Sequence, residues 1–93
     1  MIIDDLRRQD EIVTYLYNEL PESKDIKEIT AVFPEKGIAY IDRQVTILQA
    51  KGLVNVVRDY DFNSNLVSVT GKGCERAEEV LVEQYRDAKQ RGL

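Results

Sequence analysis

Apolar residues recur at helical spacing through the middle of the chain. Between residues 38 and 51 they fall three and four positions apart, which places one side of a helix against a core: Ile38, Ile41, Val45 and Leu48. Gly52 follows them, where a helix commonly ends in a left-handed glycine. Residues 53–58 are rich in valine and predict a strand. We therefore expect a helix over about residues 38–51 that passes directly into a strand.

Two further helices are predicted before this one. The first covers about residues 4–19, where apolar residues form a helical stripe that ends before Pro21. The second starts after Asp25, which can form a capping box with Glu28, and it ends before Pro34. Short helix, tight turn and longer helix together give a helix-turn-helix arrangement.

The remainder of the chain predicts a β-hairpin and a long helix. A second strand covers residues 66–69, and the turn formers lie in residues 59–65. Thr70 caps the last helix, over about residues 71–91. A helix of this length spans ~30 Å, more than a core of this size covers. We expect its distal half to pack against a partner chain.

Composition indicates one soluble domain of a cytoplasmic protein. The 93 residues suit a single domain, and no apolar run approaches the length of a membrane span. The acidic N-terminus does not resemble a secretory signal. The single cysteine, Cys74, excludes an internal disulfide framework, and we expect it to be an inert, half-buried thiol.

The residue types argue against an enzyme and against a cofactor. The chain has no histidine, which excludes Ser-His-Asp and Cys-His nucleophile systems and histidine-based metal sites. One cysteine cannot form a zinc cluster. The Thr-Gly-Lys-Gly segment at residues 70–73 lacks the order of a phosphate-binding loop, and we interpret it as a helix cap.

Two short motifs carry a resemblance to a known family. Residues 48–54 (LQAKGLV) are similar to the L-x-x-x-G-L-[VI] pattern that closes a recognition helix, and residues 69–73 (VTGKG) are similar to L-T-x-K-G after a wing. Together the chain resembles small winged helix-turn-helix transcriptional regulators of the MarR, PadR and ArsR kind. This implies an α+β, mostly α, fold in one domain over residues 1–93: three core helices, a two-stranded wing, and residues 71–91 as a dimerisation helix.

The resemblance implies a homodimer that binds double-stranded DNA in a sequence-specific manner, with residues 38–51 in the major groove. Arg43 would bond a guanine and Gln44 an adenine, and other side chains would touch thymine methyls or phosphates. The residues expected to face DNA are Lys24, Lys27, Lys36, Ala39, Tyr40, Arg43, Gln44, Thr46, Ile47 and Arg58, with Ala50 on the same face and Lys51 on its flank. The residues expected at the dimer interface are Leu6, Ala77, Leu81, Tyr85 and Ala88.

Two features favour an alternative, a winged-helix adaptor that binds a protein partner and no DNA. The net charge is −4, although the acidity lies mainly in residues 1–22. Tyr40 and Ile47 on the outer face of the central helix would form an apolar patch, and such patches mark protein interfaces.

The predicted wing tip departs from the family pattern, because it has two aspartates and no basic residue, with only Arg58 at its edge. Strand alternation favours a buried position for one of Tyr60 and Phe62.

Overall fold

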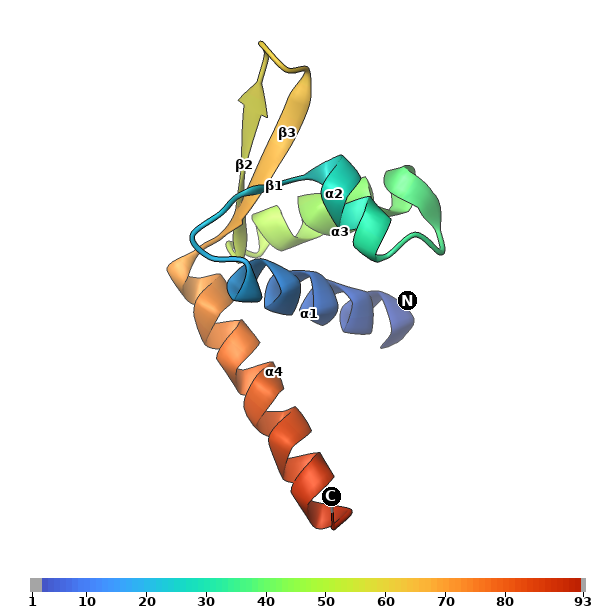
Figure 1. The fold of residues 1–93 in the computed structure, drawn as a ribbon, viewed down its shortest axis with the longest axis vertical. Coiled ribbons are helices and arrows are strands. Elements are labelled where there is room, and N and C mark those ends of the chain that lie inside the picture. The colour runs from blue at the N-terminus through green and yellow to red at the C-terminus, as the bar shows by residue number, and fades with distance from the viewer. Residues whose placement is uncertain (1–2, 93) are drawn as a thin grey trace.

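The computed structural model describes residues 3–92 and has the predicted mostly helical α+β architecture. Four helices and a small antiparallel sheet follow one another in the order shown in Figure 1. The elements are α1 (Ile3–Asn18), β1 (Lys24–Asp25), α2 (Ile26–Val32), α3 (Gly37–Ala50), β2 (Val54–Asp59), β3 (Ser64–Val69) and α4 (Gly71–Gln90). Each predicted helix is therefore present, and its ends lie within about one residue of the expected ones.

Local signals in the sequence determine where α2 and α3 begin and end. The Asp25 carboxylate accepts a hydrogen bond from the backbone of α2, and the Glu28 carboxylate accepts one from the Asp25 amide at 3.0 Å, which confirms the capping box. Gly52 has φ +77°, a left-handed conformation that glycine adopts without strain. This confirms the predicted stop after α3 and turns the chain into β2.

The sheet contains one strand that the sequence did not predict. The strand order is β1-β3-β2, with Lys24 opposite Val67 and Asp25 opposite Leu66. β1 has only two residues, too few to show an alternating pattern. The hairpin strands pair from Val54–Val69 to Asp59–Ser64, so the connecting turn is shorter than the predicted 59–65.

The core lies where α1, α2, α3 and the base of the hairpin meet (Figure 1). Its fully buried apolar side chains include Ile12, Leu16, Ile29, Ile41 and Leu48. Two expectations about this core are wrong. Ile38 is 48% exposed, because it lies in the groove between α2 and the hairpin rather than under α1. Tyr60 and Phe62 are both exposed, because they belong to the turn rather than to a strand.

The helix α4 starts at a tightly built junction. The Thr70 hydroxyl accepts a hydrogen bond from the Gly73 amide at 3.0 Å and donates one to the Gly52 carbonyl at 2.7 Å, which confirms the predicted cap. A Cβ on Gly73 would overlap the Leu53 carbonyl oxygen and lie 2.5 Å from Cγ2 of Val69. Gly73 therefore allows α4 to approach the start of β2 closely.

The distal half of α4 projects from the body of the protein. The last buried residue of the helix is Val80, whereas the helix continues to Gln90. In Figure 1 this half and the β2–β3 hairpin extend in opposite directions from the three packed helices. The described residues span 50 Å along the longest axis against 26 and 21 Å along the others.

Candidate nucleic-acid interface

The outer face of α3 is the most open helical surface near the hairpin. It consists of exposed side chains at helical spacing: Ala39, Asp42, Arg43, Thr46, Gln49 and Ala50. Arg43 forms neither an ion pair nor a side-chain hydrogen bond with any residue between 3 and 92. Its guanidinium is therefore available to an external partner. The Thr46 hydroxyl donates to the Asp42 carbonyl at 2.9 Å, which leaves its methyl group as the outward surface.

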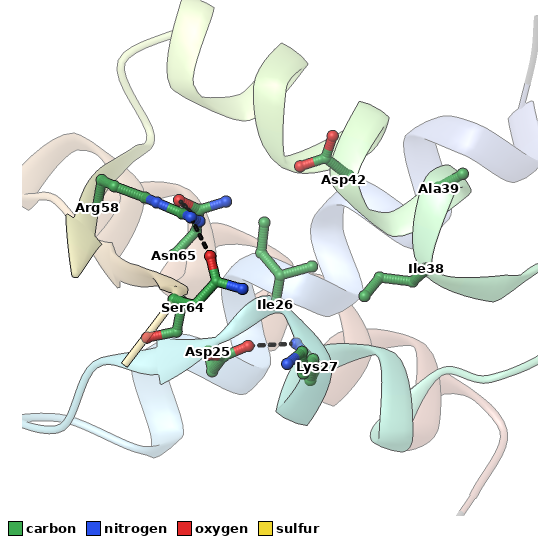
Figure 2. Close-up of a pocket in the computed structure, with 10 residues that line it drawn as sticks. Asp25, Ile26, Lys27, Ile38, Ala39, Asp42, Arg58, Ser64 and Asn65 are labelled. Atoms are coloured by element: carbon green, nitrogen blue, oxygen red, sulfur yellow. Dashed lines mark hydrogen bonds between the residues drawn. The ribbon is translucent and has the colours of Figure 1, made fainter. Parts of the chain in front are cut away.

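A groove of about 370 Å³ runs between α3, the start of α2 and the hairpin (Figure 2). Ala39 and Asp42 line it from α3, Lys27 from α2, and Arg58 from the hairpin. Ile38 points into it toward Ile26 (Figure 2). The remaining lining residues are Asp25, Asn63, Ser64 and Asn65. The groove thus joins the face of α3 to the wing and carries two basic and two acidic side chains.

Arg58 lies near the end of β2, beside the turn of the wing. Its guanidinium donates to the side-chain oxygens of Asn63 and Asn65, and it lies 5.5 Å from the centre of the Tyr60 ring. The Asp59 carboxylate accepts hydrogen bonds from the backbone amides of Asp61 and Phe62, so it is occupied within the turn. The predicted edge position of Arg58 is therefore confirmed, and the two asparagines that orient it are an addition to the predicted site.

The three predicted phosphate-contacting lysines have different surroundings. Lys27 is exposed at the start of α2, and Lys36 is exposed in the turn with its Nζ 4.8 Å from the centre of the Tyr40 ring. Lys24 instead lies between acidic side chains, 3.2 Å from Glu19 and 3.2 Å from Glu22, and only 13% of its side chain is exposed. Its hydrogen bonds to Glu22 and Glu19 raise the pKa of Lys24 above its ordinary value. The positive charge of Lys24 is therefore already compensated by glutamates of the same chain.

Two residues expected on the DNA-facing side of α3 point toward α1 instead. Gln44 is 1% exposed, and its Oε1 accepts a hydrogen bond from Nε2 of Gln9 at 2.8 Å. The Tyr40 hydroxyl donates to Asp5 at 2.8 Å, and burial, followed by this hydrogen bond, raises the pKa of Tyr40 to about 12. The expected placement of both residues is wrong, because α3 is rotated so that residues 40, 41, 44, 45 and 48 share the inner side. Ile47 lies at the boundary and is half-buried.

Several residues that line the groove were not predicted from the sequence. Asp42 lies one residue before Arg43 on the same exposed face, and Ile38 was assigned to the core. The helical period would have identified Asp42 once the rotation of α3 was known. Asn63, Ser64 and Asn65 carry no comparable signal, because turn formers in a hairpin are common whatever they contact.

The predicted dimer residues divide into two groups. Ala77 is fully buried inside the protomer, so its expected place at a dimer interface is wrong: it packs in the core. Leu6 and Tyr85 are 47% and 66% exposed, and Leu81 and Ala88 are half-buried. The apolar side chains of α4 that remain accessible to a partner therefore lie beyond Val80.

Residues 3–92 contain no group of three or more His, Cys, Asp or Glu side chains arranged to hold a metal ion. None of the helices in this range has the length and apolar character needed to cross a membrane. Cys74 is a free, half-buried thiol, as expected from its position.

Comparison with known proteins identifies the fold. No protein-family model and no curated protein sequence matches the chain. Among solved structures, Staphylococcus aureus MepR in complex with DNA superposes with a TM-score of 0.75 at 15% identity, over 91% of this chain and 70% of that one. In another structure MepR is described as the transcription regulator of the multidrug efflux pump MepA, and there the chain spans only 64% of its length.

Two further solved structures have the same fold. A mutant of Lactococcus lactis ZitR in its apo form gives a TM-score of 0.77 at 17% identity, over 96% of this chain and 65% of that one. A probable transcriptional regulator from Pseudomonas aeruginosa gives 0.74 at 20% identity, over 89% and 61%. MepR and the Pseudomonas aeruginosa protein are described as transcription regulators. The chain therefore has the winged helix-turn-helix fold predicted from its two motifs, the fold found in transcription regulators such as MepR.

Proposed function

We propose that this chain binds double-stranded DNA and regulates transcription, with α3 in the major groove. The observation that carries the proposal is the exposed face of α3 beside the hairpin, on which Arg43 has no partner within residues 3–92. A major groove admits a helix, and it presents donors and acceptors that a helix face can read. The fold shared with MepR, which has been solved in complex with DNA, supports DNA binding.

The chemistry of this face fits base recognition. Arg43 can donate two parallel hydrogen bonds to a guanine, and the neighbouring Asp42 carboxylate can accept one from a cytosine amino group. Ala39 and the methyl group of Thr46 can contact thymine methyls. Gln44 is excluded from this role because it is buried, and Tyr40 because its hydroxyl is bonded to Asp5.

Phosphate contacts would come from the borders of the groove. Three basic residues surround α3: Lys27 on α2, Lys36 in the turn before α3, and Arg58 on the hairpin. Three such residues give modest affinity, and the net charge of −4 weakens it further at low ionic strength. Binding should therefore depend on the base contacts and fall as salt is added.

We propose a homodimer through the distal half of α4, with the exposed Leu6 of α1 as a further contact. Leu81, Tyr85 and Ala88 give the helix an apolar stripe beyond its last buried residue, Val80. Residues 75–83 contain four glutamates and one arginine, whereas residues 86–91 contain three basic residues and one aspartate. Two antiparallel copies would place the acidic part of each helix beside the basic part of the other. A cytoplasmic location belongs to the same proposal.

The salt dependence of duplex binding tests the proposal. The logarithm of the affinity should fall linearly with the logarithm of the salt concentration, with a slope of about −0.9 per phosphate contact. Lys27→Ala should reduce the magnitude of the slope by about one, whereas the matched control Lys24→Ala should leave it unchanged, because Lys24 is paired with glutamates. An absence of duplex binding even at low salt would overturn the proposal.

The adaptor reading retains one supporting observation. Tyr40 no longer supports it, but Val57, Tyr60 and Phe62 on the hairpin are 61%, 84% and 79% exposed. Exposed apolar clusters of this kind mark protein interfaces. The adaptor reading predicts that Tyr60→Ser with Phe62→Ser abolishes capture of a protein partner, whereas DNA binding through α3 predicts that the same variant keeps its affinity for duplex.

A further inference from the structure

Two polar pairs join α1 to α3 one helical turn apart. The Tyr40 hydroxyl donates to Asp5 at 2.8 Å, and Nε2 of Gln9 donates to Oε1 of Gln44 at 2.8 Å. The two members on each helix are four residues apart, so both pairs lie on facing sides of the helices. Nζ of Lys51 donates to Oε1 of Gln9 at 2.7 Å and extends the second pair toward the end of α3. We call these residues the α1–α3 clamp.

The centre of the clamp is buried among apolar side chains. Gln9 and Gln44 are 5% and 1% exposed, and Ile12, Ile41 and Leu48 are part of the same buried core. Breaking the pair without replacing its hydrogen bonds would leave buried amide groups unsatisfied, which destabilises the folded state. Apolar contacts have no preferred direction, whereas these hydrogen bonds do. The clamp therefore adds a directional constraint on the rotation of α3 to the packing of the apolar core.

Rotation of α3 decides where its outer side chains point. A helix with its side chains has a radius of about 5–6 Å, so a rotation of about 20° moves a peripheral atom by ~2 Å. Hydrogen bonds to base edges do not tolerate a displacement of that size. Arg43 directly precedes Gln44 in the chain, so a rotation that moves Gln44 also moves Arg43.

We infer that Gln9, Gln44, Tyr40 and Asp5 are positioning residues that set the base specificity of α3 without touching DNA. The inference rests on the proposed DNA binding. It predicts that removal of the clamp leaves the chain folded and able to bind phosphates. Discrimination between DNA sequences should nevertheless be lost.

The test uses the double variant Gln9→Leu with Gln44→Leu, which removes both buried amides together. Lys51 loses its hydrogen bond to Gln9, but Lys51 is exposed and water can replace that partner. Replacement of buried polar pairs by apolar residues often keeps or raises stability, so the thermal midpoint should not fall. The ratio of affinities for a selected duplex and a scrambled duplex should drop by about tenfold, the scale of one lost base contact. Affinity for the scrambled duplex should stay as in the wild type.

Two other variants keep the test decisive. Tyr40→Phe removes only the hydroxyl bonded to Asp5, and it should also lower the ratio. This variant carries the test if the double variant does not fold. Ile29→Val loosens the core in α2 without touching the clamp, so it should lower the thermal midpoint and keep the ratio. An unchanged ratio in the clamp variants, or an equal loss of the ratio in Ile29→Val, would overturn the inference.

A measurement without DNA separates this inference from the proposed function. Spin labels at positions 7 and 49, in a Cys74→Ser background and diluted with unlabelled protein, report the distance between the exposed sides of α1 and α3 by electron paramagnetic resonance. The Gln9→Leu, Gln44→Leu variant should show a broader distance distribution than the parent. A distribution as narrow as the parent's contradicts the clamp. If the parent prefers no DNA sequence, the proposed function fails, and the label distances still decide whether the clamp sets the rotation.

Discussion

Asp10 on α1 and Arg76 on α4 form a two-pronged ion pair across 66 residues of sequence. Nε of Arg76 donates to one carboxylate oxygen at 3.0 Å, and Nη2 donates to the other at 2.9 Å. The hydrogen bonds from Arg76 to Asp10 are the largest cause of a raised pKa of the arginine. The pair lies where the two helices meet, before α4 leaves the body of the protein. It therefore contributes to the direction in which the distal half of α4 projects.

The first prediction concerns this ion pair. Both side chains are about one-third exposed, so water screens the interaction, and we expect a coupling free energy of about 1 kcal/mol from a double-mutant cycle. The cycle compares Asp10→Ala, Arg76→Ala and the double variant by denaturant unfolding. Additive effects of the two substitutions would show that the pair contributes no interaction energy. The cycle of Asp87 and Arg91, an exposed i,i+4 pair on α4, provides the matched weak case.

The second prediction separates two glycines in the first turn of α4. Gly73→Ala should destabilise the fold by more than about 2 kcal/mol, because the new Cβ would collide with the backbone of Leu53, just before β2, and with the side chain of Val69 in β3. Gly71→Ala is the matched control, since no atom lies within 4 Å of its Cβ position, and its stability should stay the same or rise. Thermal unfolding checks both. Equal stability of the two variants would contradict the close approach of α4 to Leu53.

The third prediction concerns alkaline pH. The pKa of Tyr40 is raised from 10.0 to about 12, so the folded state holds this proton more tightly than the unfolded chain does. Its stabilisation is complete below pH 10 and is lost as the pH rises toward about 12. Tyr40→Phe should therefore flatten the fall of unfolding free energy across this window. Tyr60→Phe, on the exposed hairpin, should reproduce the wild-type curve, and a Tyr40→Phe curve parallel to the wild type would refute the assignment.

The fourth prediction tests the proposed dimer. Leu81→Glu with Tyr85→Glu places charges on the apolar stripe of α4, so the protein should sediment as a monomer while its thermal midpoint stays unchanged. Gln49→Glu with Gln90→Glu adds the same charge at exposed positions outside the stripe and should remain dimeric. A wild-type chain that is already monomeric at high concentration would exclude this interface.

The fifth prediction assigns a base contact to Arg43. Arg43→Ala should weaken binding to the preferred duplex by about 1–3 kcal/mol and relax specificity at one position. Arg7→Ala removes the same charge from the exposed side of α1 and should have a much smaller effect. The comparison is made by fluorescence anisotropy at one salt concentration. Equal losses of affinity in the two variants would show that Arg43 acts only through its charge and contacts no base.

Elements with strong local signals were predictable from the sequence. The Asp25 and Glu28 capping box, the Gly52 stop and the Thr70 cap each depend on residues close together in the chain, and all are present. The strand β1 was not predictable, because its two residues are a strand only by virtue of pairing with Val67 and Leu66. Tertiary contact, not local propensity, creates it.

The rotation of α3 shows where sequence reasoning failed at the site. A glutamine at position 44 looks like an outward polar residue until Gln9 is known to face it from another helix. Apolar periodicity identified Ile41, Val45 and Leu48 correctly, yet it also assigned Ile38 to the same face. A pattern of residue types cannot distinguish a buried, satisfied amide from a solvated one, because the partner lies 35 residues away.

Selection of bound sequences from a random duplex pool tests the central claim most directly. The proposed function predicts enrichment of a short motif that contains a guanine read by Arg43, repeated with a centre-to-centre spacing of about 10 base pairs or a multiple of it, as a symmetric dimer requires. Selection with Arg43→Ala should yield the same spacing with a relaxed guanine position. A pool that remains random after selection at low salt would contradict DNA recognition by α3.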